Sequence, residues 1–220
     1  ALGYVEKQKE QFKRLGVIGD WENPYITLLP EYEAEQIKIF AEMASKEGTI
    51  YRGLRPVYWC PSCETALAEA EIEYQNDKCR SLYVKFKVSK DNGKLSELGA
   101  DLSKTYFIIW TTTDWTLPGN VAVCVNKDFE YSLVKSGDEF YILADALVSK
   151  VMAHGNIEDY KVIAKISGAD LEFMEADHPF LNRKSLVIVG DHVTVESGTG
   201  CVHTAPGHGM EDFEVCKNYE

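Results

Sequence analysis

Residues 82–88 read Leu82-Tyr83-Val84-Lys85-Phe86-Lys87-Val88, and from Val84 onward apolar and charged side chains alternate. A period of two is typical of a β-strand with one buried and one solvated face, and Lys85 and Lys87 then share the solvated face. The residues before this segment follow mainly a helical period, whereas most residues after it do not. A β-rich region therefore begins here.

Seven further segments are rich in β-branched and aromatic residues and are predicted to form short strands. They are Thr105–Thr111, Val121–Val125, Phe129–Val134, Phe140–Leu143, Val162–Ile166, Leu186–Val189 and Cys201–Thr204. Turn sequences such as Asn92-Gly93 separate the strands, and helical patterns cover Asp145–Ala153 and Glu211–Tyr219. Because little room is left for crossover helices, we predict an α+β, mainly β fold: a β-barrel or sandwich with peripheral helices.

Residues 1–76 carry a different pattern, which is mainly helical. Gly16 stands where a left-handed cap would end a first helix, Pro30 opens a second helix, and Gly48 ends it. We therefore predict two domains: a mainly helical connective segment over residues 1–76 and a β-barrel domain over residues 77–220. The final residues still follow a helical pattern, which predicts that the second domain is truncated at its C-terminus.

The composition excludes several classes of protein. The chain has 220 residues, of which 45% are hydrophobic and 26% charged, so a mainly disordered protein is excluded. The net charge of −12 argues against an extended nucleic-acid-binding surface, so this chain should touch only a small part of any RNA. No apolar stretch approaches the roughly 20 residues of a membrane helix, and no signal peptide is recognisable. A cytoplasmic location without a membrane anchor is expected.

Six cysteines are present, and only Cys60 and Cys63 have a spacing that suggests shared chemistry. Their segment, Trp59-Cys60-Pro61-Ser62-Cys63, is half of a tetrahedral zinc site, which needs a second pair of ligands. A redox motif is the alternative, but the flanks do not resemble a strand that feeds a helix. We therefore predict that Cys60 and Cys63 are metal ligands whose partner pair lies outside this chain.

The first motif that suggests a binding pocket is Trp110-Thr111-Thr112-Thr113-Asp114-Trp115-Thr116-Leu117-Pro118-Gly119-Asn120. Three consecutive threonines at the end of a strand place hydroxyl groups on both of its faces, and a Pro-Gly turn follows. Such a segment lines a small polar pocket with neutral donors and acceptors. The alternative is an edge strand whose threonines serve β-propensity alone.

The second motif is Gly198-Thr199-Gly200-Cys201-Val202-His203-Thr204-Ala205-Pro206-Gly207-His208-Gly209-Met210-Glu211-Asp212. Its glycines allow the backbone to approach a ligand closely. The structural alternatives are a hydrogen-bonded core histidine at His203 and simple dipole complementarity for Asp212 at a helix N-terminus. A metal site formed by His192, His203, His208 and Asp212 is a further alternative, although the spacing matches no zinc hydrolase pattern.

These two motifs resemble the two signature segments of the editing domain of bacterial isoleucyl-tRNA synthetases, a family of class I aminoacyl-tRNA synthetases. Upstream, Leu15–Trp21, Tyr51–Val57 and Thr65–Tyr74 resemble the connective insertion of the same family, so the resemblance covers essentially the whole chain. The family's His-Ile-Gly-His and Lys-Met-Ser-Lys-Ser signatures of aminoacylation do not occur in this sequence. The resemblance therefore implies the editing insertion without the ATP-using body.

The resemblance also implies roles for particular residues. Asp212 corresponds to the aspartate that holds the α-ammonium group of the substrate, and His203 to the histidine that blocks the extra methyl group of isoleucine. The resemblance assigns Asp212, Thr112 and Thr113 to catalysis, and Thr111, Thr112, Thr113, Asn120, His203 and Asp212 to substrate binding. Asp114 departs from the family pattern, since many relatives have proline at this position. The aspartate adds a negative charge beside the pocket and lacks the fixed φ of proline.

The activity implied is hydrolysis of valine wrongly attached to isoleucine tRNA, with valyl-adenylate as a second substrate. The partners implied are the charged 3′ end of that tRNA and the rest of a synthetase chain, in a monomer without membrane contact. No cofactor is expected in this chain, whereas ATP, magnesium and zinc are implied for the longer enzyme. The alternatives are a non-catalytic zinc- or RNA-binding module and a metal-dependent hydrolase.

Overall fold

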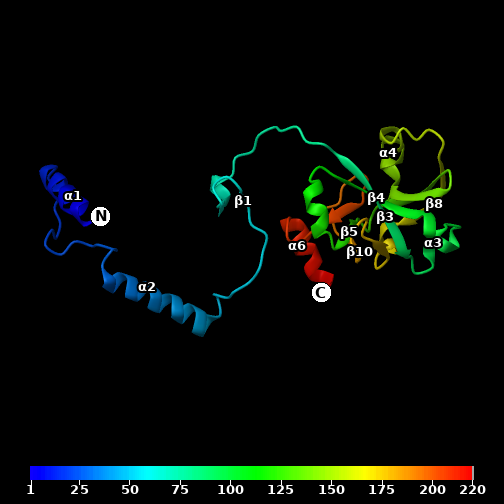
Figure 1. The fold of residues 1–220 in the computed structure, drawn as a ribbon. Coiled ribbons are helices and arrows are strands. Elements are labelled where there is room, and N and C mark those ends of the chain that lie inside the picture. Colours follow the sequence, from blue (N-terminus) through cyan, green and yellow to red (C-terminus); the bar gives the residue numbers. More distant parts are fainter. Residues whose placement is uncertain (220) are drawn as a thin grey trace. The chain divides into compact units, whose positions relative to one another are not determined.

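The protein is described by a computed structural model that covers residues 1–219, and Glu220, the last residue of the predicted second domain, lies outside the described residues. The chain divides into two compact units, Ala1–Leu54 and Arg55–Glu220 (Figure 1). The boundary therefore lies earlier than the predicted one after residue 76. The reason is that residues 55–76 contain a small hairpin, with the strands β1 (Trp59–Cys60) and β2 (Thr65–Ala66), instead of continuing the helical segment.

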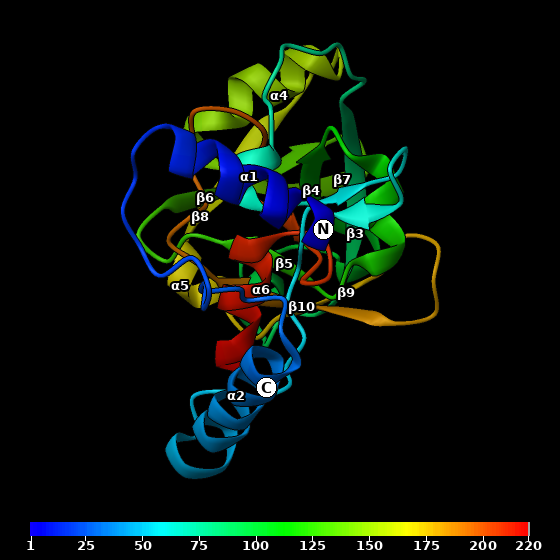
Figure 2. The same cartoon turned by 90° about the vertical axis from the view of Figure 1, so that its left-hand side faces the viewer.

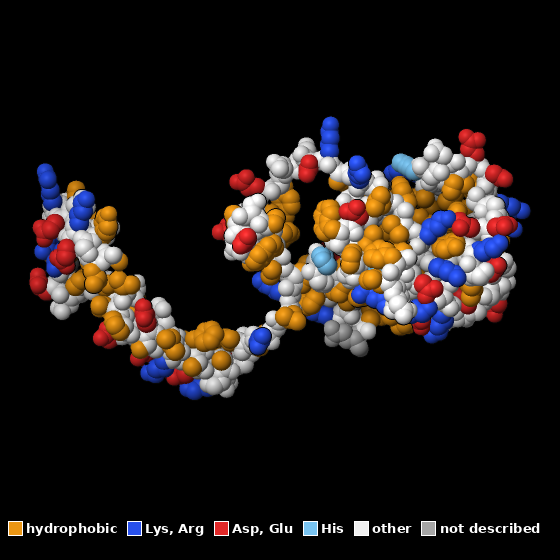
Figure 3. Space-filling model, in the orientation of Figure 1, with side chains coloured by type: hydrophobic (Ala, Val, Ile, Leu, Met, Phe, Trp, Pro, Cys, Tyr) orange, Lys and Arg blue, Asp and Glu red, His pale blue; other side chains and the backbone are white. Residues whose placement is uncertain are grey.

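The first unit is helical, as the sequence predicts. It contains α1 (Leu2–Arg14) and α2 (Pro30–Glu42), and a π-helical turn (Met43–Glu47) continues α2. Gly16 and Gly48 follow these helices with φ of 80° and 61°, the left-handed conformation expected of C-terminal caps. Neither helix buries a residue, and hydrophobic side chains are visible along the surface of α2 in Figure 3.

The second unit contains a nine-stranded sheet of mixed direction. Its strands are β3 (Leu82–Lys90), β4 (Thr105–Thr111), β5 (Ala122–Val125), β6 (Glu130–Ser136), β7 (Glu139–Ala144), β8 (Lys161–Ser167), β9 (Glu175–Asp177), β10 (Lys184–Val189) and β11 (Val202–Thr204). All eight predicted strands are present. Within this sheet only β9 was not predicted, because its three residues, Glu-Ala-Asp, show no apolar alternation.

The sheet is open and does not close into a barrel. Its strand order is β11-β5-β10-β9-β3-β4-β7-β6-β8, so β11 and β8 form its two ends. Two pairs, β5 with β10 and β4 with β7, are parallel, whereas the other pairs are antiparallel. The α+β class with peripheral helices is confirmed, but the barrel or sandwich is not. The prediction considered only single helices as crossovers, whereas here the connection between the strands of each parallel pair runs through other strands of the same sheet.

Short helices lie at the periphery of this sheet. They are α3 (Lys94–Glu97), α4 (Val148–His154), α5 (Gly168–Leu171) and α6 (Met210–Cys216), together with the 3₁₀ turns Glu69–Glu71, Leu102–Lys104, Asp114–Gly119, Asp145–Leu147 and Lys217–Tyr219. The two predicted helices correspond to α4 and α6 with their adjoining 3₁₀ turns. Within the described part of the chain, no helix has the length and apolar character that a membrane span requires.

Two apolar clusters hold the second unit together. The larger one fills the sheet's main face with fully buried side chains from β3, β4, β6 and β7, among them Phe86, Phe107, Leu133 and Ile142. The smaller one packs Val215 of α6 against Ile188 of β10 and neighbouring side chains. Figure 2 shows α6 beside β5 and β10 accordingly. This second cluster fixes the start of α6, and therefore Asp212, relative to the sheet.

Candidate functional site

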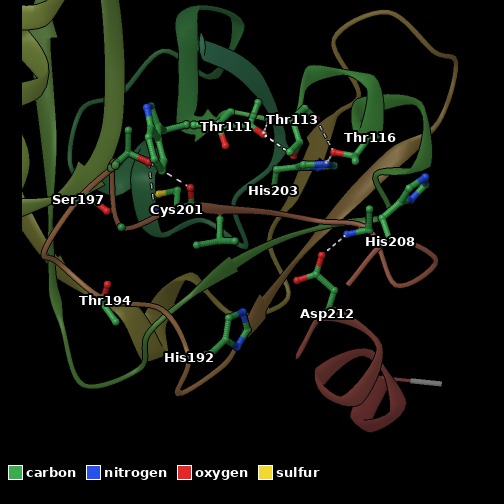
Figure 4. Close-up of a pocket in the computed structure, with 17 residues that line it drawn as sticks. Thr111, Thr113, Thr116, His192, Thr194, Ser197, Cys201, His203, His208 and Asp212 are labelled. Atoms are coloured by element: carbon green, nitrogen blue, oxygen red, sulfur yellow. Dashed lines mark hydrogen bonds between the residues drawn. The ribbon is translucent and has the colours of Figure 1, made fainter. Parts of the chain in front are cut away.

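A cavity of about 340 Å³ lies where the end of β4, the strand β11 and the start of α6 meet (Figure 4). Its lining is Trp110, Thr111, Thr112, Thr113, Thr116, His192, Thr194, Ser197, Gly198, Thr199, Gly200, Cys201, Val202, His203, Ala205, His208 and Asp212. The two motifs singled out in the sequence therefore form opposite parts of one cavity. They meet because β11 pairs with β5 at one end of the sheet and also approaches β4.

The threonine motif forms one wall of the cavity. The Thr111 hydroxyl accepts a hydrogen bond from the backbone N–H of Thr113 at 3.1 Å and lies 3.3 Å from the Thr113 hydroxyl. The Thr116 hydroxyl donates to the backbone carbonyl of Thr113 at 2.7 Å, which fastens the following 3₁₀ turn to the strand end. Thr112 lines the same cavity. The wall thus presents neutral hydroxyl groups in fixed positions.

His203 stands on β11 with only 8% of its surface exposed. Its Nε2 lies 2.9 Å from the Thr116 hydroxyl, and its Nδ1 lies 2.7 Å from the amide nitrogen of Asn120. Burial lowers the pKa of this imidazole, although the nearby Asp212 carboxylate acts in the opposite direction. His203 is therefore a neutral ring held at both nitrogens, in a fixed orientation against the cavity.

Asn120 does not line the cavity, in contrast to the direct substrate contact that the resemblance implies. Its side chain is completely buried behind His203. The amide nitrogen donates to the carbonyl oxygen of Ala122 at 2.8 Å, and the amide oxygen accepts from the Ser185 hydroxyl at 2.6 Å. The structure therefore places Asn120 where it acts on the site through His203.

Asp212 lies in the first turn of α6 and is half-buried. Its Oδ2 accepts a hydrogen bond from the backbone N–H of Ala205 at 2.8 Å, which fixes the carboxylate relative to the strand β11. No donor among the described residues is bonded to its other oxygen, and Figure 4 shows the carboxylate directed from α6 towards β11. Asp212 is the only carboxylate, and no lysine or arginine is present, among the described lining residues. The cavity is thus suited to a cationic group.

The glycines of the second motif have the role that the sequence suggests. Gly200 has a φ of +74°, and a Cβ atom placed on it would lie 2.4 Å from the Cβ of Ala144. The backbone N–H of Ala144 donates to the carbonyl of Thr199 at 2.8 Å, so the loop rests directly on the end of β7. Only glycine fits this contact and this conformation. The contact forms the floor of the cavity.

Cys201 also lines the cavity, but it is not an activated nucleophile. Its thiol is 2% exposed and points to the carbonyl oxygen of Ile142 at 3.7 Å. Burial raises the pKa of this thiol far above its usual range, so it remains protonated at neutral pH. Cys201 is therefore not the nucleophile of a hydrolytic reaction in this cavity.

Several lining residues were not predicted as site residues, among them Thr116, Thr194, Ser197 and, outside the metal alternative, His192 and His208. The most informative is His192, whose Nε2 atom is buried and has no hydrogen-bond partner in the described part of the chain. Within residues 1–219 no group of three or more His, Cys, Asp or Glu is placed to hold a metal ion, although His192, His203, His208 and Asp212 all line the cavity. A histidine that lines a cavity without a partner has no periodic or motif signal that would reveal it in the sequence.

Asp114 and the cysteine pair do not line this cavity. Asp114 begins the 3₁₀ turn after the threonine motif and is exposed to solvent. Cys60 and Cys63 lie at the turn of the β1–β2 hairpin, where the backbone N–H of Cys63 donates to the sulfur of Cys60 at 3.3 Å. This hydrogen bond lowers the pKa of the Cys60 thiol, whereas the neighbouring Cys60 raises the pKa of Cys63.

Comparison with known sequences places the chain in a family. The sequence pattern of the class I tRNA synthetases (I, L, M and V) matches residues 1–179. The isoleucine–tRNA ligase of Caldicellulosiruptor bescii is 62% identical over 219 residues, which cover 100% of this chain and 24% of that protein. The isoleucine–tRNA ligase of Moorella thermoacetica is 53% identical over 219 residues, which cover 100% of this chain and 23% of that protein. The chain thus spans about a quarter of the length of these curated relatives.

Solved structures share the fold at low sequence identity. The crystal structure described as GlLeuRS-CP1 has a TM-score of 0.55 at 20% identity, covering 63% of this chain and 60% of that one. The editing domain of the cytosolic leucyl-tRNA synthetase of P. falciparum has a TM-score of 0.52 at 14% identity, covering 63% and 67%. At these identities the likeness concerns the fold, and the described cavity must be judged by its own chemistry.

Proposed function

Because the chain belongs to the class I tRNA synthetases for isoleucine, leucine, methionine and valine, we propose that it is the editing part of an isoleucine–tRNA ligase. Its reaction is hydrolysis of the ester that joins valine to isoleucine tRNA. The observation that carries the proposal is the convergence of Thr111–Thr113, His203 and Asp212 on one cavity, because these are the residues that the resemblance assigned to substrate.

The need for such a reaction follows from the chemistry of the two amino acids. Valine is isoleucine without one methylene group, and a hydrophobic pocket separates the two by only about 1–3 kcal/mol, a limit long established for isoleucyl-tRNA synthetase itself. A second cavity that admits valine but not isoleucine removes the errors that pass the first selection. Exclusion by steric overlap is more effective than the loss of one favourable contact, because packed side chains resist displacement.

In this proposal Asp212 binds the α-ammonium group of the aminoacyl ester. The carboxylate is held by the Ala205 N–H through one oxygen, which leaves the other available for the substrate. A charge-assisted hydrogen bond to the ammonium group then fixes the amino acid at one end. Because Asp212 is the only carboxylate among the described lining residues, this contact sets the orientation of the ester.

His203 forms the wall against the amino-acid side chain. Its ring is buried, neutral and hydrogen-bonded at both nitrogens, so a larger ligand does not displace it. The threonines Thr111, Thr112 and Thr113 surround the ester and the terminal adenosine with hydroxyl groups. Hydrolysis then needs an oriented water molecule, which the free ribose hydroxyl of the substrate helps to activate, and backbone N–H groups that stabilise the oxyanion.

The wider setting of the reaction is part of the same proposal. The partners are the charged 3′ end of isoleucine tRNA and the remainder of a longer synthetase chain, in a cytoplasmic monomer. Valyl-adenylate is a second substrate of the same cavity, because it carries the same α-ammonium group and side chain. ATP and magnesium would serve aminoacylation in the longer protein, and no step of the hydrolysis described here uses them.

The Cys60–Cys63 hairpin fits half of a zinc site. The Cys63 N–H bonded to the Cys60 sulfur stabilises a thiolate, which is the form that binds zinc. A structural site needs four ligands, and within residues 1–219 no third one is placed beside this pair. We propose that a second pair from the longer protein completes the site, so that this chain alone retains much less than one zinc ion per molecule in metal analysis.

The decisive experiment compares hydrolysis of valine-charged and isoleucine-charged isoleucine tRNA by this chain and by the longest natural polypeptide that contains it. We expect rapid release of valine and slow release of isoleucine, without added metal. A metal-dependent reaction would favour a metallohydrolase. Tight tRNA binding without release of either amino acid, by both proteins, would favour a non-catalytic RNA-binding module.

A further inference from the structure

Ser185 lies on β10, outside the cavity, and is completely buried. Its hydroxyl donates to the amide oxygen of Asn120 at 2.6 Å. A buried hydroxyl on a strand has a desolvation cost unless its hydrogen bond is made, so this contact is a defined part of the structure. It also links a residue remote from the substrate to the histidine that faces it.

The hydrogen bonds beyond Ser185 have a fixed direction. Because a backbone carbonyl can only accept, the Asn120 nitrogen is the atom that faces Ala122 and His203, at 2.8 and 2.7 Å, and the Asn120 oxygen then accepts from Ser185. An amide NH₂ group has two hydrogens and no free acceptor, so the two contacts use both hydrogens. The Nδ1 atom of His203 must therefore accept, which means that it carries no proton.

The other nitrogen of His203 completes the argument. With Nδ1 unprotonated, a neutral imidazole carries its hydrogen on Nε2, which lies 2.9 Å from the Thr116 hydroxyl. The Thr116 hydroxyl donates its own hydrogen to the Thr113 carbonyl at 2.7 Å, so it accepts from His203 (Figure 4). In this series of hydrogen bonds from Ser185 to Thr113, only one placement of the hydrogen atoms gives each donor an acceptor.

We propose that Ser185 is a positioning residue: together with the Ala122 carbonyl it holds the Asn120 amide that fixes the tautomer and ring orientation of His203, and it thereby supports the selection of valine over isoleucine. The inference rests on the function proposed above only in its last step, because the tautomer itself is a property of the protein without substrate. A ring held in one tautomer and one orientation keeps the cavity wall fixed to within the size of a methyl group. Loss of the Ser185 hydroxyl leaves the Asn120 oxygen without its donor, and the ring is then held less firmly.

The first test measures the tautomer directly. The chain contains five histidines, so ring ¹⁵N spectra of selectively labelled protein can be assigned by single His→Gln substitutions. We expect His203 to be neutral, with its proton on Nε2, across neutral pH. A proton on Nδ1, or a charged ring at neutral pH, would overturn the proposal whatever the activity of the protein.

The second test uses Ser185→Ala with Ser132→Ala as the matched control. Ser132 is also completely buried on a strand and donates one hydrogen bond, to Asp145 at 2.6 Å, but it has no connection to His203. We expect Ser185→Ala to give a mixture of tautomers or a rise in the pKa of His203, whereas Ser132→Ala leaves its ring spectrum unchanged. If Ser185→Ala does not fold, Ser185→Cys keeps the volume and weakens the donor, and the same shift is expected in smaller measure.

The third test measures hydrolysis of valine-charged and isoleucine-charged tRNA in the longest natural polypeptide. We expect Ser185→Ala to lower the valine-to-isoleucine rate ratio by about 3- to 10-fold, the scale of one neutral hydrogen bond, and Ser132→Ala to leave it unchanged. An unchanged ratio and an unchanged ring spectrum in folded Ser185→Ala would refute the positioning role. If the unaltered protein hydrolyses neither ester, the proposed function fails, while the ring spectra still decide whether Ser185 positions His203.

Discussion

The two sides of the cavity differ in how completely their polar groups are paired. On the side of His203, each polar side-chain atom of the ring and of Asn120 has a protein partner. On the side of α6 and of the loop between β10 and β11, one oxygen of Asp212 and the buried Nε2 of His192 have none among the described residues. A polar group whose hydrogen bonds are all made within the protein must give one up to bind a ligand, whereas an unpaired group gains a hydrogen bond when a ligand binds. The His203 side is thus built as a rigid wall and the Asp212 side as a contact surface.

The largest effect that tests this contrast is expected at Asp212. Asp212→Ala should strongly slow hydrolysis of valine-charged tRNA in the longer protein and leave aminoacylation intact. The loss of a charge-assisted contact in a desolvated cavity costs about 2–4 kcal/mol, or roughly 30- to 1,000-fold in rate. Single-turnover deacylation measures it.

The matched control at this position is Asp212→Asn. An amide keeps an acceptor for the Ala205 N–H but has no charge for the ammonium group. We expect it to fold as well as the unaltered protein and to lose most of the hydrolysis. Near-normal editing by either variant would show that Asp212 fixes only the start of α6 and does not bind the substrate.

The next effect is on stability and concerns the floor that joins the two sides. Gly200→Ala places a Cβ 2.4 Å from that of Ala144 at a φ of +74°, so backbone and neighbour must both shift. We expect the free energy of unfolding to fall by about 2–3 kcal/mol. Gly207→Ala in the same motif is the control, because no atom lies within 4 Å of its added Cβ. Equal denaturation midpoints for the two variants would contradict the close approach.

His203→Ala is expected to alter selectivity more than rate. Removing the wall opens space for the extra carbon of isoleucine, and burial of one methylene is worth about 0.8 kcal/mol in addition to the relief of overlap. The variant should therefore begin to hydrolyse isoleucine-charged tRNA while it still hydrolyses the valine ester. Parallel loss of both reactions would instead assign His203 to catalysis or folding, and no change would remove it from the substrate cavity.

The sequence predicts the parts of this site better than their connections. The eight predicted strands exist, and the site residues predicted from the two motifs, apart from Asn120, meet in one cavity because each motif lies at a strand end. The position of Asn120 behind His203 and its bond to Ser185 were not predictable. They depend on the strand order β11-β5-β10, which includes a parallel pair and brings together residues 83 and 65 positions apart. Local periodicity contains no information on such an order.

The smallest expected effect is on the pH dependence of the free energy of unfolding. It tests only the His203 side of the cavity. Burial lowers the pKa of His203 in the folded protein below its value in the unfolded chain, which is about 6.5. The neutral ring therefore stabilises the fold fully above pH 6.5, and this contribution declines as the pH falls from there to the lowered pKa, because the unfolded chain gains a proton first. The titratable groups that act on the pKa of His203 through their charge are Asp212, His178 and His208, and of these only Asp212 raises it.

Urea unfolding of the unaltered chain and of His203→Gln at a series of pH values between 5 and 7.5 isolates this contribution, since glutamine does not titrate. We expect the unaltered chain to lose stability more steeply below pH 6.5 than the variant does. His154→Gln, at the exposed end of α4, is the control and should follow the unaltered chain. Parallel curves for the unaltered chain and His203→Gln would mean that His203 accepts a proton in the fold as readily as in the unfolded chain. The Asn120 amide would then not direct two hydrogens at the backbone and the ring, and the contrast between the two sides of the cavity would be lost.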